Sequence, residues 1–160
     1  MIWGMTTATF TLVHVVLSLI GIGAGLIVMV GLLSGRLPQG WNRLFLVTTV
    51  ATSVTGFAFP FDHLLPSHKV GIISLVVLAV AILAQYGLHL AGGWRRVYVI
   101  SAAIALYLNV FVAVTQAFLK IPVLTALAPT QAEPPFAIVQ LVVLGLFIAL
   151  TIVATKRARA

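Results

Sequence analysis

Five long apolar stretches, separated by short polar segments, make up most of this chain. None of the five contains an acidic residue, and each is close to the roughly 20 residues that an α-helix needs to cross a bilayer. The segments between them are rich in Gly and Pro, which end helices. The pattern predicts an all-α, polytopic membrane helical bundle that forms a single domain over residues 1–160. The five transmembrane helices are expected at 10–33, 44–61, 68–91, 97–119 and 136–155.

The second stretch is the least apolar because hydroxyl side chains crowd into it. A hydroxyl tolerates an apolar environment by donating to the carbonyl one turn earlier in the helix. So many hydroxyls within two turns still favour a helix enclosed by other helices. Because the stretch is also short, the alternative is a bundle of four spans in which 44–61 is re-entrant. The hydroxyl residues are Thr48, Thr49, Thr52, Ser53 and Thr55.

One face of the first stretch combines a histidine with small residues. His14, Ser18 and Gly21 lie on it, and Gly25 follows one turn later. Two glycines four residues apart let a neighbouring helix approach closely, so this face is predicted to contact protein and not lipid. Gly31 lies off this face, so a large side chain is expected to be tolerated better there than at Gly21.

The third stretch carries a histidine at each end of one helical face, and Ser67 is expected to cap its start. No second histidine lies at the depth of His89, which excludes a bundle with two haems. The residues of this face recur at steps of three and four: His68, Gly71, Leu75, Leu78, Ile82, Gln85 and His89.

The charged residues argue against a soluble protein and predict the orientation. Only 7% of the residues are charged, against about a quarter in soluble domains. The net charge is +7, but the bases cluster at span ends, which is typical of membrane topology and not of a surface that binds nucleic acid. Alternating spans put Lys69 and Lys120 on one side and the other bases opposite, which predicts an N-terminus outside and a C-terminus in the cytoplasm. The opposite set is Arg36, Arg43, Arg95, Arg96, Lys156, Arg157 and Arg159.

All five spans carry polar side chains in the outer half of the bundle. Such groups are costly in lipid and face the bundle interior, so their shared depth predicts an outer-leaflet polar pocket. His14 and His68 are the candidate axial ligands of a haem b, because haem iron accepts imidazoles. The alternative is that His14 bonds a hydroxyl or carbonyl of a neighbouring span and His68 caps a helix. Asn109, Gln116 and Gln140 are candidates to bind a quinone-like head group, or else make interhelical polar contacts.

The loop after the second stretch adds a candidate for metal chemistry. Asp62, His63 and His68, together with His14, carry the imidazole and carboxylate ligands that suit a divalent transition metal. A solvated loop is the alternative. The chain has no cysteine, no acid inside a span and no glycine-rich phosphate loop. These absences argue against thiolate metal sites, hydrolases, nucleotide enzymes and proton transporters that use carboxylates.

Two segments carry a resemblance to known proteins. They read YLNVFVAVTQAFLKIPVLTALAPTQAEPPF at 107–136 and FPFDHLLPSHKVGIISL at 59–75. They resemble a group of small, uncharacterised proteobacterial inner-membrane proteins, which implies a multi-pass protein of the bacterial inner membrane. The layout is also loosely similar to cytochrome-b-type bundles with two haems, but those need two histidine pairs and this chain has one outer pair.

The sequence therefore predicts an integral inner-membrane protein whose outer pocket binds a haem b or a quinone-like redox ligand. The alternative is a non-catalytic membrane subunit or scaffold that packs against partner membrane proteins or a second copy of itself. In either case the lipid bilayer is the immediate partner. The segment 121–135, half apolar and with four prolines, is expected to lie along the membrane interface.

Overall fold

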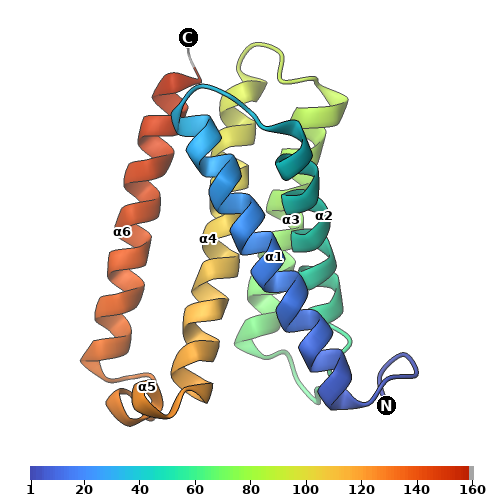
Figure 1. Cartoon of the computed structure of the whole chain (residues 1–160), viewed down its shortest axis with the longest axis vertical. Helices are drawn as coiled ribbons and strands as arrows, with labels where there is room; N and C mark the ends of the chain where they lie inside the picture. Colours follow the sequence, from blue (N-terminus) through green and yellow to red (C-terminus); the bar gives the residue numbers. More distant parts are fainter. Residues whose placement is uncertain (159–160) are drawn as a thin grey trace.

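The computed structural model describes residues 1–158, whose regular structure is helical apart from an isolated bridge between Ile2 and Met5. Arg159, one of the bases used to predict the orientation, lies outside the described residues. The long helices pack side by side, and α5 lies across one end of the bundle (Figure 1). The elements are α1 (Thr7–Leu33), α2 (Gln39–Gly56), α3 (Pro66–Ile82), the π-helix η1 (Leu83–Gly87), α4 (Trp94–Lys120), α5 (Pro122–Leu127) and α6 (Pro134–Arg157).

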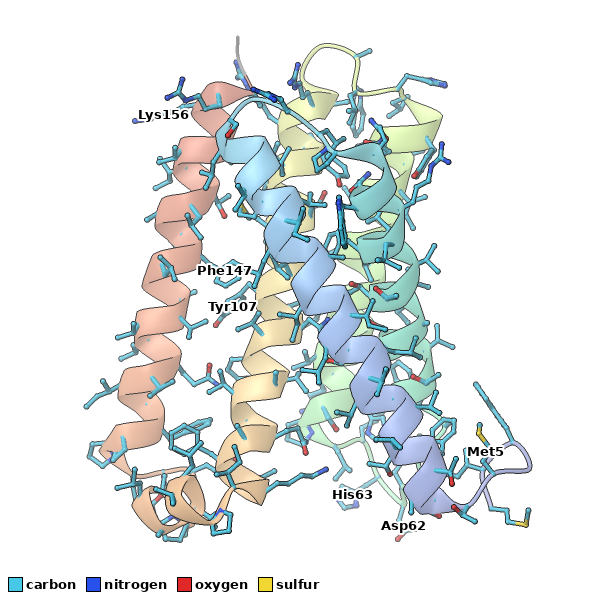
Figure 2. All side chains as sticks on the ribbon, in the orientation of Figure 1. Met5, Asp62, His63, Tyr107, Phe147 and Lys156 are labelled. Atoms are coloured by element: carbon cyan, nitrogen blue, oxygen red, sulfur yellow. The ribbon has the colours of Figure 1, made fainter. Side chains whose placement is uncertain are left out.

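The chain runs back and forth between two ends of this bundle (Figure 1). We call the end that carries Met5, Asp62 and His63 the N end, and the end that carries Lys156 the C end (Figure 2). Within residues 1–158, four helical segments are long and apolar enough to cross a membrane: α1, α3 with η1, α4 and α6. The sequence predicted five. The helix that does not qualify is α2, although it returns the chain from the C end to the N end between α1 and α3 (Figure 1).

Local sequence explains where the helices begin. Thr6 caps α1 by accepting the Thr9 backbone N–H on its hydroxyl at 3.2 Å, and α3, α5 and α6 each have proline in their first turn, where no N–H is needed. The predicted cap of α3 by Ser67 is wrong. Leu65 holds the N-cap position, and Nδ1 of His68 accepts its backbone N–H at 3.1 Å. A histidine thus replaces the Glu or Gln that usually bonds back to the N-cap.

The third helix ends earlier than predicted. It changes from α to π geometry at Leu83, and the Leu88 N–H bonds to the Leu83 carbonyl at 2.9 Å. His89 and Leu90 then have φ values of 51° and 56°, which cannot continue a right-handed helix. His89 therefore lies exposed in the turn before α4 and not on the helical face where the sequence placed it.

The closest packing lies where α1 meets α2 and α4. A Cβ atom added at Gly25 would lie 2.5 Å from Cδ1 of Leu106 and 2.9 Å from Cδ2 of Phe45, so a larger residue there would have to displace these side chains. The predicted close packing of the glycine face is therefore confirmed. The expectation for Gly31 is wrong, because a Cβ atom there would lie 2.6 Å from Cδ of Pro38 in the turn after α1.

The most peripheral of the long helices is α6. It packs on α4 and α1, and only 11% of its most apolar stretch is buried. Tyr107 of α4 and Phe147 of α6 face each other across the contact, with ring centroids 5.7 Å apart (Figure 2). The segment 121–135 forms α5 and a turn that link α4 to α6 at the N end (Figure 1).

Candidate functional site

A cavity of about 100 Å³, lined by both polar and apolar side chains, lies among α1, α2, α3 and α4, in the half of the bundle nearer the N end. The sequence predicted a polar pocket at this depth, and His14, His68 and Asn109 all line the cavity. Phe57, at the end of α2, adds an aromatic wall. The polar residues of the lining are His14, Ser18, Thr49, Thr52, Ser53, Ser67, His68, Ser74 and Asn109.

His14 has one ring nitrogen occupied and the other free. Its Nδ1 lies 2.8 Å from Oγ1 of Thr55. Because the Thr55 hydroxyl donates to the Ala51 carbonyl at 2.7 Å, its oxygen accepts from Nδ1–H of His14. A neutral His14 then has Nε2 as an acceptor, and no group in residues 1–158 bonds to that atom. A hydrogen bond from His14 to a hydroxyl of a neighbouring span was the predicted alternative to haem ligation.

His68 has the opposite arrangement of hydrogens. It is 4% exposed, and its Nδ1 accepts the backbone N–H of Leu65. A neutral His68 therefore carries its hydrogen on Nε2, which has no acceptor among the described residues. The rings of Phe57 and Phe61 lie 5.5 Å and 4.1 Å from the imidazole, centroid to centroid. The two histidines thus offer a free acceptor and a free donor on side chains that line one cavity.

Asn109 of α4 is held in place by hydrogen bonds to α1, and it forms the part of the cavity wall where these two helices meet. The Ser18 hydroxyl donates to its Oδ1 at 2.8 Å, and its Nδ2 donates to the Ser18 carbonyl at 3.4 Å. A Cβ atom at Gly21 would lie 3.2 Å from Nδ2, so glycine at this position leaves room for the amide. Because both ends of the amide are engaged, Asn109 shapes the cavity more than it offers a free hydrogen-bonding group.

The hydroxyls of α2 behave as predicted with one exception. Four of them donate to the carbonyl one turn back, at 2.6 to 2.9 Å. Thr49 does not: it is 1% exposed, and its Oγ1 has no partner among residues 1–158. This oxygen would lie 3.1 Å from a Cβ atom at Gly21, so it is enclosed by the crossing of α1 and α2. Ser53 also bonds across to Ser74 of α3 at 3.1 Å, which ties two walls of the cavity together.

The two glutamines predicted for this pocket lie elsewhere. Gln116 is exposed on the last turns of α4, because α1 crosses the bundle at an angle and diverges from α4 toward the N end (Figure 1). Gln140 is buried between α6 and α4, where its Nε2 donates to the Phe111 carbonyl and to Oγ1 of Thr115, each at 3.2 Å. Its role is an interhelical contact, which was the alternative for this residue.

The predicted metal ligands do not come together. Asp62 and His63 are exposed in the loop at the N end and project away from the bundle, whereas His14 and His68 line the cavity (Figure 2). In the part of the chain that the structure describes, no group of three or more His, Cys, Asp or Glu side chains is placed to hold a metal ion. The separation arises because Leu65 and Pro66 start α3 after the loop and turn His68 inward.

A second polar cluster, which the sequence analysis missed, lies nearer the C end. The Tyr98 hydroxyl donates to Oδ1 of Asn42, and Nε2 of Gln85 donates to Oε1 of Gln39 at 3.0 Å. Nδ2 of Asn42 and Oε1 of Gln85 are buried without a partner among residues 1–158. The signal was available, because Gln39 and Asn42 are three residues apart and share a helical face, but both precede the predicted span 44–61.

Comparison with protein-family models, with curated proteins and with solved structures found no match.

Proposed function

We propose that this chain is a multi-pass protein of the bacterial inner membrane that crosses the bilayer five times, with the N end outside and the C end in the cytoplasm. The path of α2 between the two ends supports the fifth crossing (Figure 1). The polar side chains of α2 are compatible with a position inside the bilayer. Most of its hydroxyls donate to carbonyls of the same helix, and its polar face packs against the rest of the bundle. The resemblance of 59–75 and 107–136 to small inner-membrane proteins supports the choice of membrane.

The distribution of bases supports the orientation. Lys69 and Lys120 lie in the helix turns nearest the N end. The remaining described bases lie in the turns or terminal helical turns of the C end, as the positive-inside rule requires of a cytoplasmic face. They are Arg36, Arg43, Arg95, Arg96, Lys156 and Arg157.

The activity best supported is the binding of a lipid-soluble molecule with a small ring head group that both donates and accepts a hydrogen bond, as a quinol does. The observation that carries this proposal is that His14 and His68 line one cavity and each has a ring nitrogen without a partner in residues 1–158, an acceptor on His14 and a donor on His68. A ring with two hydroxyls in para positions could donate from one hydroxyl to His14 and accept from His68 at the other. Phe57 on the cavity wall suits a flat ring.

The size of the cavity favours a ring over a haem. A cavity of about 150 Å³ in another protein holds benzene, and pockets for larger ligands measure about 300–1,000 Å³. At about 100 Å³, this cavity is smaller than either, so a quinol ring would need to widen it slightly. A haem b between His14 and His68 would require the helices around the cavity to separate.

Calorimetric titration of the purified protein in detergent with a short-tailed benzoquinol tests this proposal. His14→Leu removes the acceptor, while Thr55 keeps its bond to the Ala51 carbonyl. We expect the affinity to fall about fivefold to tenfold, which corresponds to the loss of one hydrogen bond. The matched control is Gln116→Leu, which removes a polar side chain of α4 outside the cavity and should leave the affinity unchanged.

Three outcomes would contradict the proposal. One is wild-type protein that does not bind the benzoquinol, and another is an equal loss of affinity in both variants. The third is a Soret band in the absorption spectrum of the purified protein, which would identify haem as the ligand and require a wider cavity than the one described.

A second candidate is a non-catalytic membrane subunit, and the peripheral position of α6 favours it. Most of the apolar surface of α6 is uncovered by the rest of the chain, so it is available to another membrane protein or to a second copy. The mass of the complex extracted in a mild detergent tests this candidate. A monomeric mass would leave lipid as the only neighbour of α6.

A further inference from the structure

An open apolar groove of about 700 Å³ runs along the outside of α2, between this helix and the end of α3. On α2 it extends from Arg43 to Val54, which is about 16 Å at 1.5 Å per residue. This length is close to half of the ~30 Å hydrocarbon core of a bilayer. The groove therefore has the length and polarity of a site for one acyl chain of a single leaflet. The apolar side chains that line it include Leu46, Val47, Val50, Val54 and Ile82.

The C-end mouth of the groove carries an exposed cation with no protein partner. Arg43 makes no hydrogen bond or ion pair within residues 1–158. The two acids of the chain, Asp62 and Glu133, belong to segments of the N end and cannot reach it. An anion that pairs with Arg43 would therefore come from outside the described residues.

An aromatic hydroxyl flanks this cation. Tyr86, in the π-helix η1, is 44% exposed and lines the same groove. Tyrosine is enriched at the depth of lipid head groups because its ring suits the apolar side and its hydroxyl the polar side. Arg43 and Tyr86 together therefore mark the level at which a phosphate group would lie.

We propose that this groove binds an anionic phospholipid, with one acyl chain between α2 and α3 and the phosphate group on Arg43. An arginine binds a phosphate through paired charge-assisted hydrogen bonds, and its net charge selects an anionic lipid over a zwitterionic one. The groove lies on the outer side of α2, whereas the histidine cavity lies on its inner side, so this site is independent of the proposed quinol site.

Thermal unfolding of the purified protein in detergent, titrated with phosphatidylglycerol or with phosphatidylcholine, tests the proposal. Phosphatidylglycerol should raise the midpoint more than phosphatidylcholine does, and Arg43→Gln should weaken its apparent affinity about tenfold. Arg96→Gln is the matched control, because Arg96 is an exposed C-end base outside the groove. Val50→Phe keeps Arg43 but fills the groove, and should also remove the lipid-dependent rise.

The same titration distinguishes a lipid site from two simpler explanations. If Arg43→Gln and Arg96→Gln lose the same stabilisation, the effect is general surface charge and the proposal fails. If glycerophosphoglycerol, which has no acyl chains, stabilises as well as the lipid does, the groove has no part in binding. Equal stabilisation by phosphatidylcholine would overturn the selection of an anion.

Discussion

Replacement of Gly25 by alanine tests the helix crossing on which the cavity depends. The added Cβ atom would lie 2.5 Å from Cδ1 of Leu106 and 2.9 Å from Cδ2 of Phe45, well inside the roughly 3.5–4.0 Å of a favourable carbon contact. Such overpacking costs about 1–3 kcal/mol. Alanine gains about 0.5–1 kcal/mol over glycine within a helix. We therefore expect Gly25→Ala to destabilise the bundle by about 1 kcal/mol, the middle of the difference between the two effects.

Gly23 provides the matched control on the same helix. A Cβ atom added there meets nothing within 4 Å, so Gly23→Ala should gain the helical preference of alanine and lose no packing. The unfolding midpoints of the two variants, followed by circular dichroism in one detergent, should differ by roughly 5 °C for a chain of this size. Equal midpoints would mean that Leu106 and Phe45 move aside freely and that α1 does not pack tightly on α2 and α4.

Three further variants test single hydrogen bonds. Thr49→Val replaces a buried, unpartnered hydroxyl with a methyl group of the same shape and should raise the unfolding free energy by about 1 kcal/mol; a loss of stability would reveal a bound partner for the hydroxyl. Tyr98→Phe removes the only bond of the buried Asn42 amide within residues 1–158 and should cost about 1 kcal/mol or more, and an unchanged midpoint would argue against that bond. The hydrogen bond from the Thr130 hydroxyl lowers the pKa of Glu133. The contact between the two side chains is therefore fully present at a pH above the usual glutamate pKa, and it is lost as the pH falls through the lowered pKa. The Thr130 amide chemical shift should follow this titration in the wild type and not in Glu133→Gln.

The helices were predictable where the apolar pattern alone defines them. The predicted spans 10–33 and 97–119 lie within α1 (Thr7–Leu33) and α4 (Trp94–Lys120). The end of the third helix was not predicted, because Gln85 and His89 continue the spacing of one helical face and Gly92 and Gly93 indicate a later stop. The switch to π geometry and the positive φ of His89 leave no mark in composition.

The site was predictable in depth and not in detail. Counting residues from each span end placed His14, His68 and Asn109 in one half of the bundle, and the structure places all three on one cavity. Gln116 failed the same argument, although it shares a face with Asn109, because the tilt of α1 away from α4 is set by packing and cannot be read from spacing.

The polarity of α2 links the fold to the candidate function. A helix in lipid gains stability from apolar side chains, yet α2 directs Asn42, Thr48 and Thr49 inward and all three are buried. If α2 served only to fill the bundle, apolar residues of the same volume would do so at lower cost, since Asn42 and Thr49 each keep a buried polar atom that has no partner in the described part of the chain. Near the N end, Thr55 holds the His14 ring in the tautomer that leaves Nε2 free. Thr55 is thus one of the polar residues that lower the hydropathy of α2, and it also determines which nitrogen of His14 is free to accept a hydrogen bond. This is expected if the polar residues of α2 serve binding and not stability.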